Sequence, residues 1–256
     1  MFLFFKTLKT RNRLLYYFGL INLVAAICCI ALIGFTSTTL LGVNAWIKPF
    51  KFFVSTVIFC FTMGWVMVYL ERQIKVKIYS WVVVAVLAFE NIYIAYQAGK
   101  GQLSHFNIFS IFHGIMFSLM GIAISILTLW TAYVGYLFFK QNFKELPPAY
   151  VWGIRLGILF FVIFAFEGGV MASRLAHTVG APDGSAGLPV VNWSKNYGDL
   201  RIAHFIGMHA LQVLPFTSYY YIKKPRFFLV FAMVYFLLTS FFYWQAMQGR
   251  SFVAIM

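Results

Sequence analysis

Charged side chains are scarce in this chain of 256 residues. Asp, Glu, Lys and Arg together make up 10% of it, and only six residues are acidic. Soluble domains carry roughly 25% charged residues. Hydrophobic residues account for 62% and the mean hydropathy is +0.84. A water-soluble fold cannot bury so much apolar surface, whereas a lipid bilayer can, so the composition predicts an integral membrane protein.

Cysteine is also scarce, and its placement excludes a disulfide framework. Cys28, Cys29 and Cys60 all lie within apolar runs, and no C-x-x-C pair occurs. We therefore expect the cysteines to be small buried side chains. A cleavage site of the A-x-A type is missing after the first apolar run, which predicts that this run is retained as a membrane span.

Long apolar runs fill the rest of the chain and predict an all-α, polytopic membrane bundle, a single transmembrane domain over residues 1–256. The seven predicted spans are 14–36, 49–70, 78–97, 108–139, 150–173, 200–222 and 227–247. Residues 1–13 are predicted to form an amphipathic segment on the cytoplasmic surface. Residues 177–199, rich in Gly, Pro and Asn, form an outer loop that is either a lid or a connector.

The positions of the basic residues predict the orientation. With the N-terminus in the cytoplasm, most of the 20 Lys and Arg residues fall on the cytoplasmic side, as the positive-inside rule requires. Seven spans then place the C-terminus outside. The net charge of +14 is explained by orientation and by contacts with anionic membrane lipids, so we expect no nucleic-acid partner. The bacterial cytoplasmic membrane is the predicted location.

Ionisable residues inside the spans are few, and they lie at one level. On the predicted topology, the five histidines and the two carboxyl groups inside spans all fall in the outer half or the outer loops. A rise of 1.5 Å per residue places four side chains on four helices at roughly 8–12 Å below the outer surface. They are Glu90, His113, Glu167 and His209. We expect them to converge on one buried polar site.

A second, shallower group of side chains carries positive charge or imidazole rings. It contains Lys51, His105, Arg174, Arg201 and His204. These side chains are predicted to bind a small anionic ligand above the buried site. His204 and His209 are five residues apart, about 140° around a helix, so they are expected to face different neighbours.

Two functional hypotheses suit these residues. In the first, His113, His209, Glu90 and Glu167 hold a metal ion or a b-type haem, with Glu90 and Glu167 as catalytic groups in redox or hydrolytic chemistry. In the second, the protein is a proton-coupled transporter or a receptor for a small anion or lipid headgroup, without a metal. A third interpretation is purely structural, with ion pairs Glu90–Lys51 or Glu167–Arg174.

Overall fold

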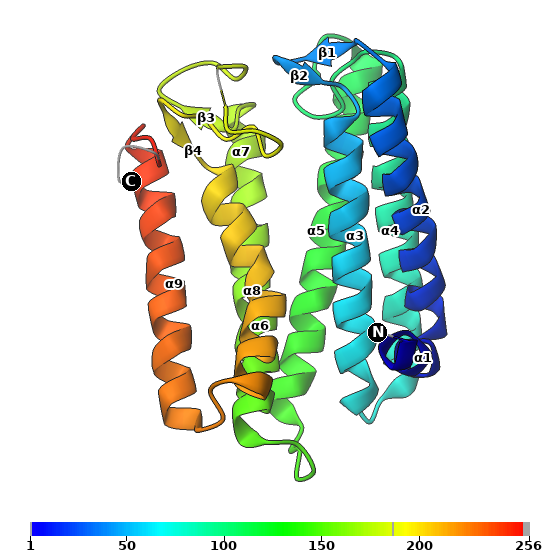
Figure 1. The fold of residues 1–256 in the computed structure, drawn as a ribbon, viewed down its shortest axis with the longest axis vertical. Coiled ribbons are helices and arrows are strands. Elements are labelled where there is room, and N and C mark those ends of the chain that lie inside the picture. Colours follow the sequence, from blue (N-terminus) through cyan, green and yellow to red (C-terminus); the bar gives the residue numbers. More distant parts are fainter. Residues whose placement is uncertain (1, 186, 253–256) are drawn as a thin grey trace. The chain divides into compact units, whose positions relative to one another are not determined.

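The structure is a computed structural model that describes residues 2–185 and 187–252. The chain is almost entirely helical (Figure 1). In order, the elements are α1 (Phe2–Arg11), α2 (Arg13–Phe35), β1 (Thr39–Leu40), β2 (Val43–Asn44), α3 (Ile47–Val66), the short 3₁₀ helix η1 (Met67–Tyr69), α4 (Gln73–Gly99), α5 (Ile111–Lys140), α6 (Pro148–Ala165), α7 (Glu167–Arg174), β3 (Thr178–Val179), β4 (Gly198–Asp199), α8 (Arg201–Tyr220) and α9 (Pro225–Met247). The strands form two antiparallel pairs, β1–β2 and β3–β4.

Among the described residues, six helical segments are long and apolar enough to cross a membrane. They are Arg13–Phe35, Ile47–Tyr69, Gln73–Gly99, Ile111–Lys140, Pro148–Arg174 and Pro225–Met247. Helix α8 has a similar length but is more polar, because it carries one Arg, two His and one Gln. The predicted multi-pass helical class is confirmed by these segments.

The chain divides into two compact units, Met1–Leu127 and Thr128–Met256, and α5 contributes to both. Unit 1 contains α1 to α4 and the first part of α5. Unit 2 contains the end of α5 and α6 to α9. The prediction of a single transmembrane domain stays a prediction.

In unit 1, polar side chains join the apolar helices α2, α3 and α4. The amide nitrogen of Asn91 donates to Asn22 Oδ1 at 2.8 Å and to Thr56 Oγ1 at 2.9 Å. All three side chains are buried. A polar group in an apolar interior is costly unless it is hydrogen bonded, so these contacts favour one arrangement of the three helices.

Helix α1 lies across the end of unit 1 at which α3 ends and α4 begins (Figure 1). Arg11 donates to the carbonyl oxygen of Trp65 at 2.8 Å, and its guanidinium lies 4.0 Å from the centre of the Trp65 ring. Leu8 is fully buried, whereas Leu3 is largely exposed. The predicted amphipathic segment is thus a helix, and it packs on the end of α3.

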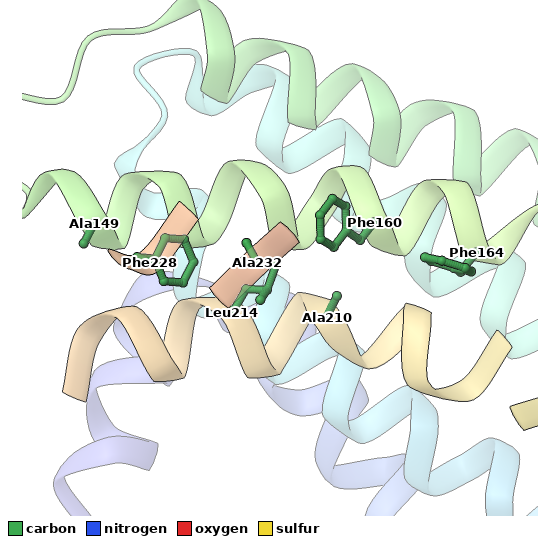
Figure 2. Close-up of a cluster of buried hydrophobic side chains, with 7 residues drawn as sticks. All are labelled: Ala149, Phe160, Phe164, Ala210, Leu214, Phe228 and Ala232. Carbon is green, nitrogen blue, oxygen red and sulfur yellow. The ribbon is translucent and has the colours of Figure 1, made fainter. Parts of the chain in front are cut away.

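In unit 2, glycines allow α6 and α8 to approach closely. A Cβ atom added at Gly153 would lie 2.9 Å from Pro215 Cα, and one added at Gly157 would lie 3.0 Å from the Ala210 carbonyl oxygen. Both glycines lie on the face of α6 that contacts α8. Figure 2 shows the adjoining apolar cluster of α6, α8 and α9, in which Ala149, Phe160, Phe164, Ala210, Leu214, Phe228 and Ala232 are buried.

The span predicted as continuous over 150–173 is interrupted. Helix α6 ends at Ala165, and α7 begins at Glu167 after a single turn residue, Phe166. Two glycines, Gly168 and Gly169, follow the interruption, and glycine is among the weakest helix formers. Helix α7 then ends at Arg174, and the next residue, Leu175, has a left-handed φ of 51°.

Candidate functional site

Glu90 is the buried acid of unit 1. It lies in α4 and its side chain is 4% exposed. Its Oε1 atom has no hydrogen-bond partner within the described part of the chain. Lys48, in the first turn of α3, is the cation whose charge acts on this carboxyl group. Unit 1 thus buries an acid on which the charge of Lys48 acts.

Three further polar side chains of unit 1, those of Tyr93, Gln97 and His113, lie close together. Gln97 is fully buried, and its amide nitrogen lies 3.0 Å from the Tyr93 hydroxyl and 3.1 Å from His113 Nδ1. The Tyr93 hydroxyl lies 3.3 Å from the same His113 nitrogen. Glu90, Tyr93 and Gln97 occupy one face of α4, because they are spaced by three and four residues.

The predicted residues at the α4–α5 connection of unit 1 lie among aromatic rings. The His105 ring lies 5.6 Å from the ring of Phe52 and 6.1 Å from that of Phe117. Its Nδ1 atom lies 3.1 Å from Ser104 Oγ. Lys51 lies in the first turn and a half of α3 and is partly buried.

Glu167 is the buried acid of unit 2. It is the first residue of α7, directly after the interruption, and its side chain is 6% exposed. Neither carboxyl oxygen has a hydrogen-bond partner among the residues that the structure describes. The structural interpretation pairs Glu167 with Arg174. The Arg174 side chain is exposed at the end of α7.

His204 contacts the backbone at the interruption of α6 and α7. Its Nδ1 atom lies 2.7 Å from the carbonyl oxygen of Phe164. A carbonyl oxygen only accepts hydrogen bonds, so Nδ1 carries the hydrogen and neutral His204 keeps a lone pair on Nε2. The ring therefore satisfies a backbone acceptor beside Glu167.

The two remaining residues of α8 have other contacts. His209 Nδ1 lies 3.1 Å from Gln212 Oε1, and its ring packs on Phe205 at 4.3 Å between centres. This confirms the expectation that His204 and His209 face different neighbours. Arg201 donates to both carboxyl oxygens of Asp199, at 2.9 and 2.6 Å, and to the Asn192 carbonyl oxygen.

The loop of residues 177–199 in unit 2 is built around a second carboxyl group. Asp183 accepts hydrogen bonds from the backbone N–H groups of His177 and Thr178, and from His177 Nδ1 at 2.7 Å. Burial raises the pKa of the Asp183 carboxyl, but the hydrogen bonds and charge of His177 outweigh burial and hold the pKa well below its usual value. Asp183 thus stays ionised and fastens the loop to the start of β3.

The predicted inner group is divided between the units. Glu90 and His113 lie in unit 1, and Glu167 and His209 lie in unit 2. Within residues 2–185 and 187–252, no three His, Cys, Asp or Glu side chains form a group that could hold a metal ion. Their assignment as catalytic or metal-binding residues stays a prediction.

Three contacts in the structure involve residues outside the predicted site. Helical spacing alone indicated that Tyr93 and Gln97 share the face of Glu90. The Asn22–Asn91–Thr56 contacts were also signalled, since asparagines inside apolar spans are rare and informative. Nothing in the local sequence indicated that His204 would bind the Phe164 carbonyl, because that contact joins α8 to α6.

Comparison of the chain with protein-family models, with curated proteins and with solved structures found no match. The class of the protein rests on its own composition and fold. Apolar helices of membrane-spanning length, with buried glutamates among them, define a multi-pass integral membrane protein.

Proposed function

We propose that this membrane protein is a proton-coupled transporter of a small anion, in which Glu90 and Glu167 take up and release protons. The observation that supports the proposal is that each unit buries one glutamate with a carboxyl oxygen that lacks a hydrogen-bond partner among the described residues. An ionised carboxyl group in an apolar interior costs several kcal/mol, so each site exchanges a proton rather than remaining charged.

The substrate class follows from charge. The chain carries 20 Lys and Arg residues against six acids, and Lys48 and Lys51 lie close together at the start of α3. Excess positive charge attracts an anion. A proton moving with a monovalent anion keeps the net charge transferred at zero, which avoids the cost of carrying charge through the bilayer. A free anion and an anionic lipid headgroup share this chemistry.

The proposed topology includes α8 as the seventh span. At one end of unit 2, Thr178 and Val179 of β3 pair with Asp199 and Gly198 of β4, which joins the end of α7 to the start of α8. At the other end, α8 ends at Tyr220 and α9 begins at Pro225. Helix α8 therefore starts beside the end of the α6–α7 span and ends beside the start of α9, so it must cross the same thickness as these apolar spans. Its packing on α6 shields the polar residues of α8.

The N-terminus is proposed to be cytoplasmic and the C-terminus outside, in a bacterial cytoplasmic membrane. Basic residues gather where α1 packs on unit 1, at the turn between η1 and α4. They are Lys6, Lys9, Arg11, Arg13, Arg72, Lys75 and Lys77. This cluster is typical of a cytoplasmic surface.

The function can be tested in liposomes that contain the purified full chain and a trapped pH-sensitive dye. Gradients of chloride, nitrate or inorganic phosphate serve as probes, and vesicles with added anionic lipid test a headgroup substrate. We expect at least one anion gradient to drive proton movement. Glu90→Gln and Glu167→Gln should each reduce that movement at least tenfold, because glutamine cannot release a proton.

The matched control is Glu145→Gln, the same substitution at an exposed glutamate between α5 and α6. It should leave transport unchanged. The proposal would be contradicted if Glu90→Gln and Glu167→Gln both still transport. It would also be contradicted if none of the anion gradients drives proton movement.

A second candidate function is the binding of a metal ion or b-type haem, for which His113 of unit 1 and His209 of unit 2 are the candidate ligands. The observation that favours it is that Nδ1 of each ring contacts a glutamine side chain, Gln97 at 3.1 Å and Gln212 at 3.1 Å. Nδ1 of His209 donates to Gln212 Oε1, which leaves the Nε2 lone pair to bind a metal. Nδ1 of His113 accepts from the Gln97 amide nitrogen, so His113 would bind a metal through Nε2 only with the Gln97 amide reversed. In this function Glu90 and Glu167 would be the acidic groups of the site.

The visible spectrum and the metal content of the purified protein test this candidate. A Soret band would identify haem, and stoichiometric iron, zinc or copper without such a band would identify a non-haem ion. Either signal should disappear in His113→Ala and His209→Ala but persist in His105→Ala. A metal-free, colourless protein that transports anions with protons would decide for the first function.

A further inference from the structure

Glu90 lies inside unit 1, whereas His113, near the start of α5, is partly exposed. We infer that Tyr93 and His113 relay protons between the outer end of unit 1 and Glu90, with Gln97 as the residue that positions both. The inference rests on the proposed function, because it supplies the route by which one of its two acids exchanges protons.

The first link joins His113 to Tyr93. The hydroxyl oxygen and Nδ1 are 3.3 Å apart, so a small rotation of either side chain makes a direct hydrogen bond. Both side chains carry groups that can donate and accept a proton. Tyr93 is 6% exposed, so its hydroxyl lies inside the unit, whereas the His113 ring is reachable from the α4–α5 connection.

Gln97 fixes this link through the two hydrogens of its amide nitrogen. That nitrogen lies 3.0 Å from the Tyr93 oxygen and 3.1 Å from His113 Nδ1. The Gln97 amide donates one hydrogen to each of these two atoms, so the Tyr93 oxygen acts as an acceptor. Its own hydrogen is then available for another acceptor.

Glu90 provides that acceptor one turn further along the same face of α4. Residues three apart on a helix have Cβ atoms about 5–6 Å apart, a distance that side-chain rotation or one water molecule can bridge. Glu90 Oε1 is buried and has no hydrogen-bond partner among the described residues. Lys48 is the charged group that acts on Glu90, and Tyr96 is the other titratable group that acts on Tyr93.

The proton steps balance. In the neutral His113 ring Nδ1 accepts from Gln97, so the ring hydrogen is on Nε2. A proton from outside binds Nδ1 and displaces the Gln97 hydrogen bond. Tyr93 gives its hydroxyl proton to the Glu90 carboxylate and receives the Nδ1 proton of His113. The net result is one proton taken from outside, Glu90 converted from carboxylate to carboxylic acid, and Tyr93 and His113 returned to their starting forms.

Time-resolved infrared spectroscopy of the purified full chain can follow this transfer. A rapid drop in pH should produce the carbonyl band of a protonated carboxyl group, and Glu90→Gln assigns the band to Glu90. Tyr93→Phe removes only the hydroxyl group and should slow the appearance of the band about a hundredfold, the typical contribution of one positioned proton-transfer group. Tyr136→Phe, the same change at an exposed tyrosine in the unit 2 part of α5, should have no effect.

His113→Ala should slow the band to a similar extent, and free imidazole in the buffer should restore much of the rate. Rescue by imidazole separates proton transfer from a merely structural role. The inference is overturned if Tyr93→Phe and His113→Ala protonate Glu90 as fast as the natural chain, or if imidazole does not restore the rate. A Glu90 band that does not respond to pH also overturns it.

The outcome separates the relay from transport. If the infrared rates change as expected while liposomes show no anion-driven proton movement, the relay stands and the proposed transport fails. If liposomes transport and the rates do not depend on Tyr93 or His113, the transport stands and the relay fails.

Discussion

The two units hold apolar helices together in different ways. Unit 1 joins α2, α3 and α4 by hydrogen bonds among the buried side chains of Asn22, Thr56 and Asn91. Unit 2 brings α6 and α8 together at Gly153 and Gly157, where backbones approach too closely for a side chain. Lipid removes the usual hydrophobic attraction between helices, and both solutions replace it with close contact or hydrogen bonding.

The same difference extends to the two buried acids. Glu90 lies inside a continuous helix, on the face that also carries Tyr93 and Gln97. Glu167 lies where a span is interrupted and where His204 binds the Phe164 carbonyl oxygen. Polar side chains thus accompany the acid of unit 1, whereas an altered backbone accompanies the acid of unit 2. The comparison predicts that Glu90 depends on its neighbours for proton exchange and that Glu167 depends on the local backbone.

The largest expected effect is a loss of transport without a loss of stability when either buried glutamate is replaced. Glu167→Gln and Glu90→Gln should each lower anion-driven proton movement at least tenfold and leave the free energy of unfolding unchanged or higher, because neither carboxyl is in an ion pair in the described structure. Titration with a denaturing detergent in mixed micelles measures the stability. A large loss of stability would show that the acids are structural.

Next in size is the effect of filling the glycine contact of unit 2. Gly153→Ala should destabilise the protein by about 3 kcal/mol, since the new methyl group would meet the Pro215 backbone. Gly169→Ala is the matched control. Nothing lies within 4 Å of a Cβ atom there, so better helix propensity should stabilise α7 by about 0.5–1 kcal/mol. Equal effects at the two positions would show that the close approach at Gly153 does not stabilise unit 2, and the proposed contrast with unit 1 would fail.

Much of the fold was predictable because apolar runs of membrane-spanning length have few alternatives. The contact between His209 and Gln212 was also predictable, since residues three apart on a helix are neighbours. The close approach at Gly153-x-x-x-Gly157 is a spacing typical of membrane helix pairs, and it could have been read from the sequence.

The rest depended on which helix faces meet. The Tyr93–His113 contact joins α4 to α5, and the His204–Phe164 contact at the interruption joins α8 to α6. In residues 177–199, Gly, Pro and Asn indicated turns. The pairing of Asp183 with His177 depends on how this loop folds, which the sequence did not indicate. Hydrophobic periodicity indicates which face of each helix is buried, but it does not indicate which helix packs against that face.

The third prediction concerns how the stability of the loop 177–199 in unit 2 depends on pH. Asp183 has a folded-state pKa below the unfolded value of about 3.9, so its stabilisation is present above about pH 4 and is lost as the pH falls through the folded pKa. Asp183→Asn should lower loop stability by about 2 kcal/mol at neutral pH, the contribution of hydrogen bonds to a charged group.

Limited proteolysis of the full chain in lipid nanodiscs measures this effect. Cleavage within residues 177–199 should be faster in Asp183→Asn than in the natural chain at neutral pH. With an acid protease, the natural chain should lose protection below about pH 4, and the variant should change much less over that range. Glu145→Gln should behave as the natural chain, and identical cleavage in all three proteins would contradict the assigned role of Asp183.

The smallest expected effect tests the polar contacts of unit 1. A double-mutant cycle of Asn22→Leu and Asn91→Leu should give a coupling energy of about 1 kcal/mol, since hydrogen bonds between membrane helices contribute little more than this. Each single variant leaves a buried amide without its contact, whereas the double variant replaces both amides with apolar groups and should recover part of the loss. Additive effects would mean that the 2.8 Å contact between Asn22 and Asn91 does not stabilise unit 1, and that its helices are held, like those of unit 2, by packing.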